Sequence, residues 1–392
     1  MSEKISVRKY RLTSIDMLRG TVLVIMALDH VRDMVTHPLS ANYSAAVDFA
    51  GSASALFFTR WITNFCAPTF VLLAGVSAFM YGAIQRRSRG EVTRFLVTRG
   101  VWLVFLELTV IGFAWSFNLH TKPFLQVIWA IGWSMIALSA LVWLPRGVIA
   151  GFGVVMIVAH NGLDSIQPVL SEASPLWMLL HIPGTLTVSG TPVALIVYPL
   201  IPWIGVMALG YAIGPYFTRP NPDRPRHLLF TGAVLILLFL VLRVTNLYGD
   251  PMAWAPQPSN AATIISFLNV TKYPVSLQFL LVTLGPALML LGWFERLTGP
   301  ISNILVTFGR VSFFYYILHL YLIHVIGVSI GLWQGFTLHE MTVSFLDTPQ
   351  NFGLTLSGVY IVWIITVTAM YPACKWFAGI KTRRRDWWLS YL

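Results

Sequence analysis

Ionisable side chains stand at both ends of the first apolar segment, residues 14–36, which predicts a membrane-spanning helix. At about 100° per residue, Arg19 and His30 fall within about 20° of each other on the helix surface. His37 is nearly eclipsed with His30. The polar stripe on this face consists of Asp16, Arg19, His30, Asp33 and His37. Asp29 points about a quarter-turn away from it.

Such a stripe indicates chemistry within the membrane, because ionisable groups are costly there and usually mark functional sites. Imidazole titrates near neutral pH, so histidines beside carboxylates can accept protons and pass them on. Arg19 and His30 lie about 16 Å apart along the axis, so the stripe runs from one edge of the helix into its far half. Two simpler explanations stay open. Asp16 and Arg19 can form an ordinary i,i+3 ion pair, and Asp29 and Asp33 can simply end the helix in water.

The elements that must position this stripe are further membrane-spanning helices. Hydrophobic residues make up 56% of the 392-residue chain and charged residues only 10%, against about 25% charged residues in a typical soluble domain. The sequence therefore predicts an all-α, polytopic membrane bundle that forms a single domain over residues 1–392. The ten predicted helices cover about residues 14–36, 62–85, 93–117, 124–145, 147–163, 192–217, 228–247, 275–295, 303–331 and 352–376.

The distribution of charge predicts the orientation of this bundle. The formal net charge is +11, and most lysines and arginines fall on one side of the membrane if both termini are cytoplasmic. We expect these basic loops to contact membrane lipid rather than nucleic acid, for which the sequence has no motif. Cys66 and Cys374 lie in apolar surroundings and suggest neither a disulfide framework nor a metal cluster. The histidines are scattered without H-E-x-x-H spacing, so no metal site is expected.

Several long motifs resemble one family of membrane enzymes. The segment "RLTSIDMLRGTVLVIMALDHVRD" is similar to the first helix of bacterial relatives of heparan-alpha-glucosaminide N-acetyltransferase. The resemblance continues in "FFTRWITNFCAPTFVLLAG", "QVIWAIGWSMIALSAL", "YPLIPWIGVMALGYAIG", "NVTKYPVSLQFLLVTLGPAL" and "FGRVSFFYYILHLYLIH". It spans about residues 11–376. The spacing of Arg19 and His30 also resembles the first-helix motif of the wider transmembrane acyltransferase superfamily.

The resemblance implies an integral membrane acyltransferase. Such enzymes take an acyl group, typically acetyl, from cytosolic acyl-CoA and deliver it to an amine or hydroxyl of a sugar on the far side. Arg19, with Arg310 as a second candidate, can then bind the phosphates of acetyl-CoA. His30, further across the membrane, can remove the proton of the attacking amine or hydroxyl. Asp29 or Asp33 can orient the His30 ring and support its imidazolium form.

Two departures from the family leave roles open. In the animal enzyme the active histidine lies further along, in the outer segment, which makes His37 a rival to His30 as the base. Many bacterial relatives have a histidine where the segment "TRWITNFCAP" has Asn64, a candidate for binding the acceptor. The acceptor itself stays open between peptidoglycan, a lipid-linked sugar, an exopolysaccharide and a small amino sugar.

Two other segments carry candidate substrate-binding residues. A predicted helix places Ser312, Tyr316 and His319 at i, i+4 and i+7, on one polar face. A histidine packed and hydrogen-bonded between helices is the simpler explanation of His319. The segment "IVAHNGLD" places His160 and Asn161 at the outer end of another helix, where they can contact the acceptor sugar or simply end the helix.

A different class of function also fits the stripe. A proton-coupled membrane transporter would use its Asp and His residues as a proton relay. Transporters usually show paired internal repeats with broken helices, and the sequence shows no such symmetry. A non-catalytic membrane subunit is a third possibility. The resemblance favours the enzyme, implies the bacterial cytoplasmic membrane as its location and suggests a homodimer.

Overall fold

The computed structural model describes residues 12–36, 51–166, 174–343, 348–349, 351–384 and 386–390. The helices, in chain order, are α1 (Thr13–Val35), α3 (Gly51–Thr63), α4 (Cys66–Ile84), α5 (Arg89–Leu106), the π-helix η2 (Glu107–Ile111), α6 (Gly112–Ser116), α7 (Val127–Leu141), α8 (Arg146–Ala159), η3 (His160–Ile166), α10 (Pro175–Leu180), α11 (Leu200–Ile213), η4 (Gly214–Phe217), α12 (Arg224–Thr245), α13 (Asn260–Leu268), α14 (Leu277–Phe294), α15 (Pro300–Arg310), α16 (Ser312–Trp333), α17 (Leu338–Thr342), α18 (Leu356–Arg383) and η5 (Trp387–Ser390). The strands are β1 (Phe124–Leu125), β2 (Gly184–Val188) and β3 (Thr191–Ile196).

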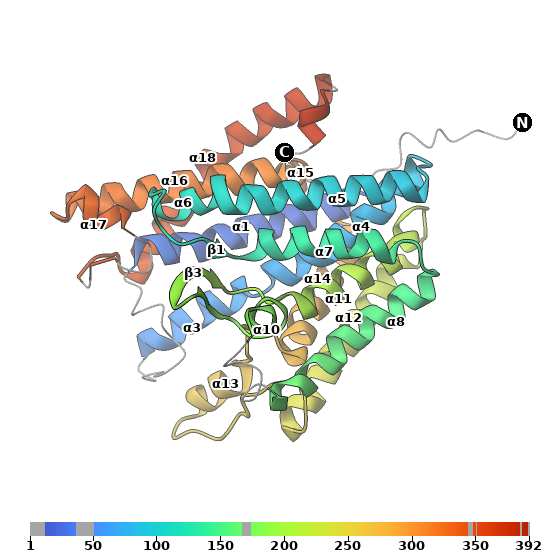
Figure 1. The fold of residues 1–392 in the computed structure, drawn as a ribbon, viewed down its shortest axis with the longest axis horizontal. Coiled ribbons are helices and arrows are strands. Elements are labelled where there is room, and N and C mark those ends of the chain that lie inside the picture. Colours follow the sequence, from blue (N-terminus) through green and yellow to red (C-terminus); the bar gives the residue numbers. More distant parts are fainter. Residues whose placement is uncertain are drawn as a thin grey trace, which may run out of the picture.

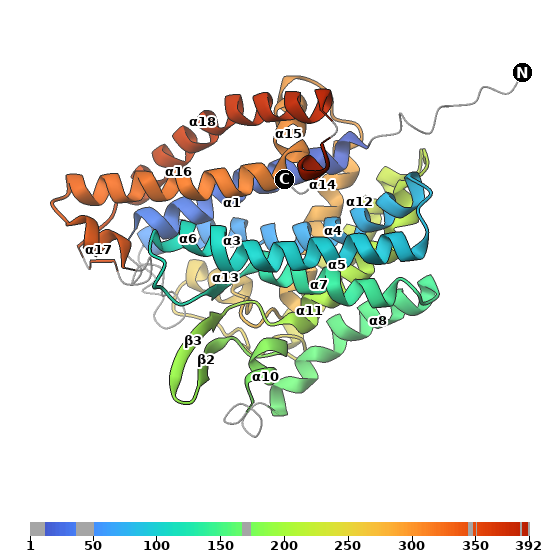
Figure 2. The same ribbon diagram turned by 45° about the horizontal axis from the view of Figure 1, so that its top comes forward.

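The predicted all-α membrane bundle is confirmed. Within the described ranges, eight helical stretches are long and apolar enough to cross a membrane, and they correspond to eight of the ten predicted helices. The other two predicted helices are present as α1, which carries several charged residues, and α7, which has 15 residues. The long helices run together in one bundle, and the small sheet lies along one side of it with α10 (Figures 1 and 2).

The prediction of a helix over residues 192–217 is wrong at its start, because β3 occupies residues 191–196. β2 and β3 form an antiparallel hairpin, and β1 pairs with β3 in parallel. Ser189 and Gly190 close the hairpin with positive φ angles of 51° and 80°, which suits a tight turn between strands. β3 is mostly apolar and therefore resembled the helix that follows it. The helix α11 begins only after Pro199.

The single helix predicted over residues 303–331 is in fact two helices. The chain leaves helical geometry at Val311, where φ is −123° and ψ is 37°. α15 therefore ends at Arg310 and α16 begins at Ser312. Because of this break, the end of one helix and the start of the next border the same cavity.

The helix α1 lies inside the bundle, packed against α4, α14, α15, α16 and α18 (Figures 1 and 2). Its approach to α15 depends on glycine. A Cβ atom at Gly309 would lie 1.8 Å from the carbonyl oxygen of Asp16, and one at Gly20 would lie 2.0 Å from that of Leu305. Small residues permit such close contact between helix backbones. The contact brings the N-terminal half of α1 beside the end of α15.

Candidate active site

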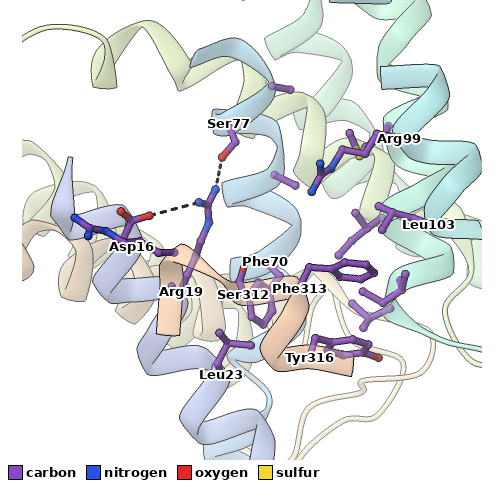
Figure 3. Close-up of a pocket in the computed structure, with 18 of the residues that line it drawn as sticks. Asp16, Arg19, Leu23, Phe70, Ser77, Arg99, Leu103, Ser312, Phe313 and Tyr316 are labelled. Carbon is purple, nitrogen blue, oxygen red and sulfur yellow. Dashed lines mark hydrogen bonds and ion pairs between the residues drawn. The ribbon is translucent and has the colours of Figure 1, made fainter. Parts of the chain in front are cut away.

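A cavity of about 300 Å³ borders the N-terminal half of α1 (Figure 3). We call it the inner cavity, and its volume is at the lower end of the range for ligand sites, about 300–1,000 Å³. Side chains from α4, α5, α7, α15, α16 and α18 complete its wall. Among the described residues, its cationic lining residues are Arg19, Arg99, Arg310 and Lys381, and its acidic lining residue is Asp16. This excess of positive charge suits an anionic ligand.

Arg19 borders this cavity from α1 and is held by contacts to α4 and to its own helix. Its guanidinium donates hydrogen bonds to the Ser77 hydroxyl and, at 3.4 Å, to the Leu73 carbonyl oxygen. Its Nη1 lies 3.8 Å from Oδ1 of Asp16, so the predicted i,i+3 pair is present (Figure 3). The Arg19 side chain stays 22% exposed. It is thus fixed in position and still accessible to a ligand.

Toward the middle of α1 the lining of the inner cavity becomes apolar. Leu23 and Met26 border it from α1, and Phe70 borders it from α4. Val127 and Ile128 of α7 complete this part of the wall. The inner cavity therefore combines a cationic region with an apolar one, and an elongated ligand with an anionic head and a less polar arm would match both.

A second cavity, of about 90 Å³, borders the C-terminal half of α1. We call it the outer cavity, after the predicted orientation. Its polar and charged lining residues are Asp29, His30, Asp33, Thr63, Asn64, Gln126, Tyr198, Lys272 and Tyr273. Met26, Phe70 and Val127 line both cavities. The two cavities therefore adjoin near the middle of α1, one turn before His30.

His30 is paired with a histidine of α16. Its Nδ1 lies 2.8 Å from Nε2 of His319, and Nδ1 of His319 lies 2.9 Å from the carbonyl oxygen of Tyr315. A carbonyl oxygen only accepts, so Nδ1 of His319 carries a proton and Nε2 of the neutral ring accepts one hydrogen bond. Nδ1 of His30 must then be the donor, which leaves the lone pair of His30 on Nε2. The hydrogen-bond chain thus fixes Nδ1 of His30 as the donor and Nε2 as the acceptor of the ring.

Packing fixes the His30 ring in this orientation. The side chain is only 8% exposed. Its ring lies edge-on to Trp115, with centroids 5.2 Å apart, and stacks on His319 at 5.0 Å. The predicted polar face of α16 is turned toward α1, because Ser312 and Tyr316 line the inner cavity and His319 contacts His30. A ring held on several sides cannot easily turn away from a substrate.

The carboxylates of Asp29 and Asp33 bind Arg32 rather than the His30 ring. Nη2 of Arg32 lies 2.7 Å from Oδ1 of Asp29 and 2.6 Å from Oδ1 of Asp33. Thr63 donates a further hydrogen bond to Asp29, at 2.8 Å. In the described part of the chain, neither carboxylate is hydrogen-bonded to His30. His319 occupies the orienting position expected for them, and 289 positions of sequence separate it from His30.

Loop residues outside the membrane-spanning helices complete the outer cavity. Nζ of Lys272 lies 3.8 Å from Oδ2 of Asp29. Burial opposes the charge of Lys272, but Tyr273 and Asp29 outweigh this effect and raise the pKa of its ammonium group. Burial, together with the neighbouring Tyr273, raises the pKa of the Tyr198 phenol well above its usual range. At neutral pH the outer cavity therefore presents a charged lysine and a neutral phenol.

The other predicted site residues are distributed between the cavities and the rest of the fold. Asn64 lines the outer cavity. His160 and Asn161 line neither the inner nor the outer cavity. Both ring nitrogens of His160 contact backbone carbonyl oxygens, at 2.8 and 2.7 Å, and the Asn161 amide oxygen accepts a backbone N–H of α14 at 2.9 Å. These contacts join η3 to the segment around the start of α14. His37 lies outside the described residues.

Sequence reasoning missed several polar and charged residues that line the cavities: Arg99, Gln126, Lys272 and Lys381, and the hydroxyl-bearing Thr63, Ser77, Tyr198 and Tyr273. Arg99 and Lys381 are recognisable from the sequence only as part of the excess of basic residues on one side of the membrane. That excess predicts orientation and does not indicate that the two residues share a cavity. Gln126 is placed by its own backbone N–H, which donates to Oε1 of Glu107 at 2.7 Å. Only the packing of η2 against β1 reveals that contact.

Comparisons with known proteins bear on this site. A family model described as "Heparan-alpha-glucosaminide N-acetyltransferase, catalytic" matches residues 11–247, a range that includes His30 and most of the outer cavity. No curated protein matches the chain. The ranges that the structure describes contain no group of three or more His, Cys, Asp or Glu residues that could hold a metal ion.

Proposed function

Because the chain belongs to the heparan-alpha-glucosaminide N-acetyltransferase catalytic family, we propose that it moves an acetyl group from cytosolic acetyl-CoA to a sugar across the membrane. The acceptor group is an amine or hydroxyl on the extracytoplasmic side. The observation that carries this proposal is that two cavities, one along each half of α1, adjoin one turn before His30. Donor and acceptor can then reach one reacting centre without either crossing the membrane. In this proposal the protein lies in the bacterial cytoplasmic membrane with both termini in the cytoplasm.

The inner cavity is the proposed site for acetyl-CoA. Its arginines can form charge-assisted hydrogen bonds with phosphate, and guanidinium suits this task because several of its donors are fixed in one plane. The apolar stretch at Leu23, Met26 and Phe70 then receives the pantetheine arm. Arg19 and His30 lie about 16 Å apart along α1, so an extended arm brings the thioester toward His30 when its phosphates stay near Arg19.

His30 is the proposed general base. The acceptor nitrogen or oxygen forms a bond to the thioester carbon while Nε2 of His30 takes its proton. The C–S bond breaks, and the imidazolium of His30 then gives this proton to the departing CoA thiolate. His319 contributes by accepting the Nδ1 proton of His30, a bond that strengthens when the ring becomes positively charged. His319 is thus a positioning residue in this scheme.

The outer cavity is the proposed site for the acceptor. Asn64, Gln126 and Tyr273 offer amide and hydroxyl groups that can bind sugar hydroxyls. Among the described residues, Nε2 of Gln126 is buried without a hydrogen-bond partner, and such a donor is costly to leave unused. Asp29 and Asp33 are held beside His30 by Arg32. Lys272 lies against Asp29 in the same cavity, so the charge of the two carboxylates is compensated and they can accept hydrogen bonds from the sugar.

The proposal is tested by giving the purified, detergent-solubilised protein acetyl-CoA labelled in its acetyl group, together with a panel of amino sugars and glycan fragments. We expect a labelled acetyl sugar, formed about 10²–10⁴ times more slowly by His30→Ala, the usual contribution of a general base. His227→Ala is the matched control, because His227 is an exposed histidine outside both cavities. Absence of label from every acceptor, or full activity of His30→Ala, would contradict the proposal.

A further inference from the structure

The side chain of Tyr316 carries a buried hydroxyl group that the fold leaves unused. It is only 4% exposed, and its hydroxyl has no hydrogen-bond partner among the described residues. A buried hydroxyl without a partner forfeits its hydrogen bonds to water, at a cost of about 1–3 kcal/mol. Such groups are uncommon in folded proteins and call for a reason. A ligand that fills the cavity beside Tyr316 would supply the missing partner.

The position of Tyr316 indicates which part of a ligand it would meet. Tyr316 lines the inner cavity from α16, and its ring projects beneath that of Phe313, parallel to it at 6.3 Å (Figure 3). Its ring centroid is 6.1 Å from that of His30 and 5.7 Å from that of His319. Tyr316 thus lies on the inner side of the junction of the two cavities, opposite the base on the outer side.

We propose that the Tyr316 hydroxyl donates a hydrogen bond to the carbonyl oxygen of the acetyl thioester and stabilises the oxyanion that forms there. This inference rests on the proposed function. As the acceptor attacks, the carbonyl π electrons move onto oxygen, and the Tyr316 O–H group holds this negative charge without giving up its proton. When the carbonyl re-forms, the C–S bond breaks and CoA leaves as the thiolate. The acceptor proton resides on His30 until the thiolate takes it.

The separation of His30 and Tyr316 fits this division of roles. A base must lie about 3 Å from the attacking atom, and an oxyanion donor about 3 Å from the carbonyl oxygen. The two groups must therefore face one another across a single acyl group. The ring centroids are 6.1 Å apart, with planes at 77°, so both side chains are close enough to reach one small acyl group.

The neighbouring residue Tyr315 provides a matched control. It is also fully buried, and its hydroxyl likewise has no partner among the described residues. Tyr315 lines neither cavity, and its ring packs on Phe308, with centroids 5.2 Å apart. Replacing either tyrosine with phenylalanine removes one unpaired hydroxyl from the same helix, so only a role in the reaction distinguishes the two changes.

The experiment compares Tyr316→Phe and Tyr315→Phe for the kcat of acetyl transfer and for the Kd of acetyl-CoA. We expect Tyr316→Phe to lower kcat about 10²–10³-fold, the usual effect of removing one oxyanion donor. The Kd should stay within about twofold of the wild-type value, because the thioester carbonyl contributes little to ground-state binding. Tyr315→Phe keeps the backbone carbonyl oxygen that His319 contacts and removes only a hydroxyl outside both cavities, so it should leave both constants nearly unchanged. Retained binding also shows that the variant is folded.

Three results would overturn the inference. One is a kcat for Tyr316→Phe close to that of wild type. Another is an equal loss in Tyr315→Phe, which would indicate a packing effect on α16. The last is a weaker Kd with unchanged kcat, which would assign Tyr316 to binding only. If wild-type protein itself transfers no acetyl group, the proposed function fails and the inference with it, an outcome that the wild-type assay distinguishes from the other three.

Discussion

Replacing His319 with phenylalanine should slow acetyl transfer although the base itself remains. In the wild-type protein, Nε2 of His319 accepts the Nδ1 proton of His30 at 2.8 Å. The two side chains are 0% and 8% exposed, so water cannot readily replace this bond. Phenylalanine fills similar space but offers no acceptor. The His30 ring then loses the interaction that holds its proton on Nδ1, and the tautomer protonated on Nε2 cannot act as the base.

The size of the effect follows from the cost of the lost bond. A buried donor left without its partner costs about 1–3 kcal/mol. If the whole of this cost falls on the reactive tautomer of His30, transfer slows about 5- to 150-fold, because about 1.4 kcal/mol corresponds to a factor of ten. His30→Ala removes the base altogether and should cost about 10²–10⁴-fold. We therefore expect His319→Phe to be slower than wild type but faster than His30→Ala.

The assay measures kcat of acetyl transfer at saturating acetyl-CoA for single and double variants. His319→Gln places a carbonyl oxygen at a similar reach and should recover part of the rate. In the His30→Ala background, His319→Phe should cost nothing further, because it acts through His30. The reasoning is refuted if His319→Phe slows transfer equally with and without His30, or if His319→Gln is no faster than His319→Phe.

Three further predictions follow from the same geometry. Arg19→Ala should weaken acetyl-CoA binding, measured by calorimetry, at least about tenfold, or about 1.4 kcal/mol. Arg226→Ala is the control and should not weaken binding, because Arg226 is an exposed basic residue outside both cavities. An unchanged affinity in Arg19→Ala would remove Arg19 from the phosphate site. His37→Ala should cost less activity than His30→Ala, and the reverse ranking would show that the outer histidine is the base. Because the pKa of Lys272 is raised, its ammonium group stays charged and paired with Asp29 at every pH below that value. The ion pair is lost only as the pH rises through the raised pKa. The difference in thermal midpoint between wild type and Lys272→Met should therefore stay constant from about pH 6 to 9, and a difference that disappears within this range would contradict the assignment.

The parts of the fold that local sequence determines were predictable. Apolar length and composition predicted the membrane-spanning helices, and helical periodicity placed Arg19 and His30 on one face of α1. The same periodicity placed Tyr316 and His319 on one face of α16. These predictions depend only on neighbours within a few turns of one helix, and the structure agrees with them.

The features that depend on packing between distant segments were not predictable. The bond between His30 and His319 exists because α16 lies against α1, and no spacing rule connects the two residues. Asp29 and Asp33 were expected to serve His30, but Arg32 on the same helix is a stronger partner for both carboxylates. The hairpin before α11 and the break at Val311 were hidden because both lie in continuous apolar sequence.

The central claim is that the acetyl group passes between two cavities that open toward opposite faces of the membrane. Sealed vesicles containing the purified protein test it directly, with an amino sugar trapped inside and labelled acetyl-CoA, which cannot cross the bilayer, added only outside. We predict that label accumulates on the enclosed sugar, that His30→Ala slows this accumulation about 10²–10⁴-fold, and that free acetyl-CoA stays outside. Transfer that occurs only when both substrates are on the same side of the membrane would contradict the claim.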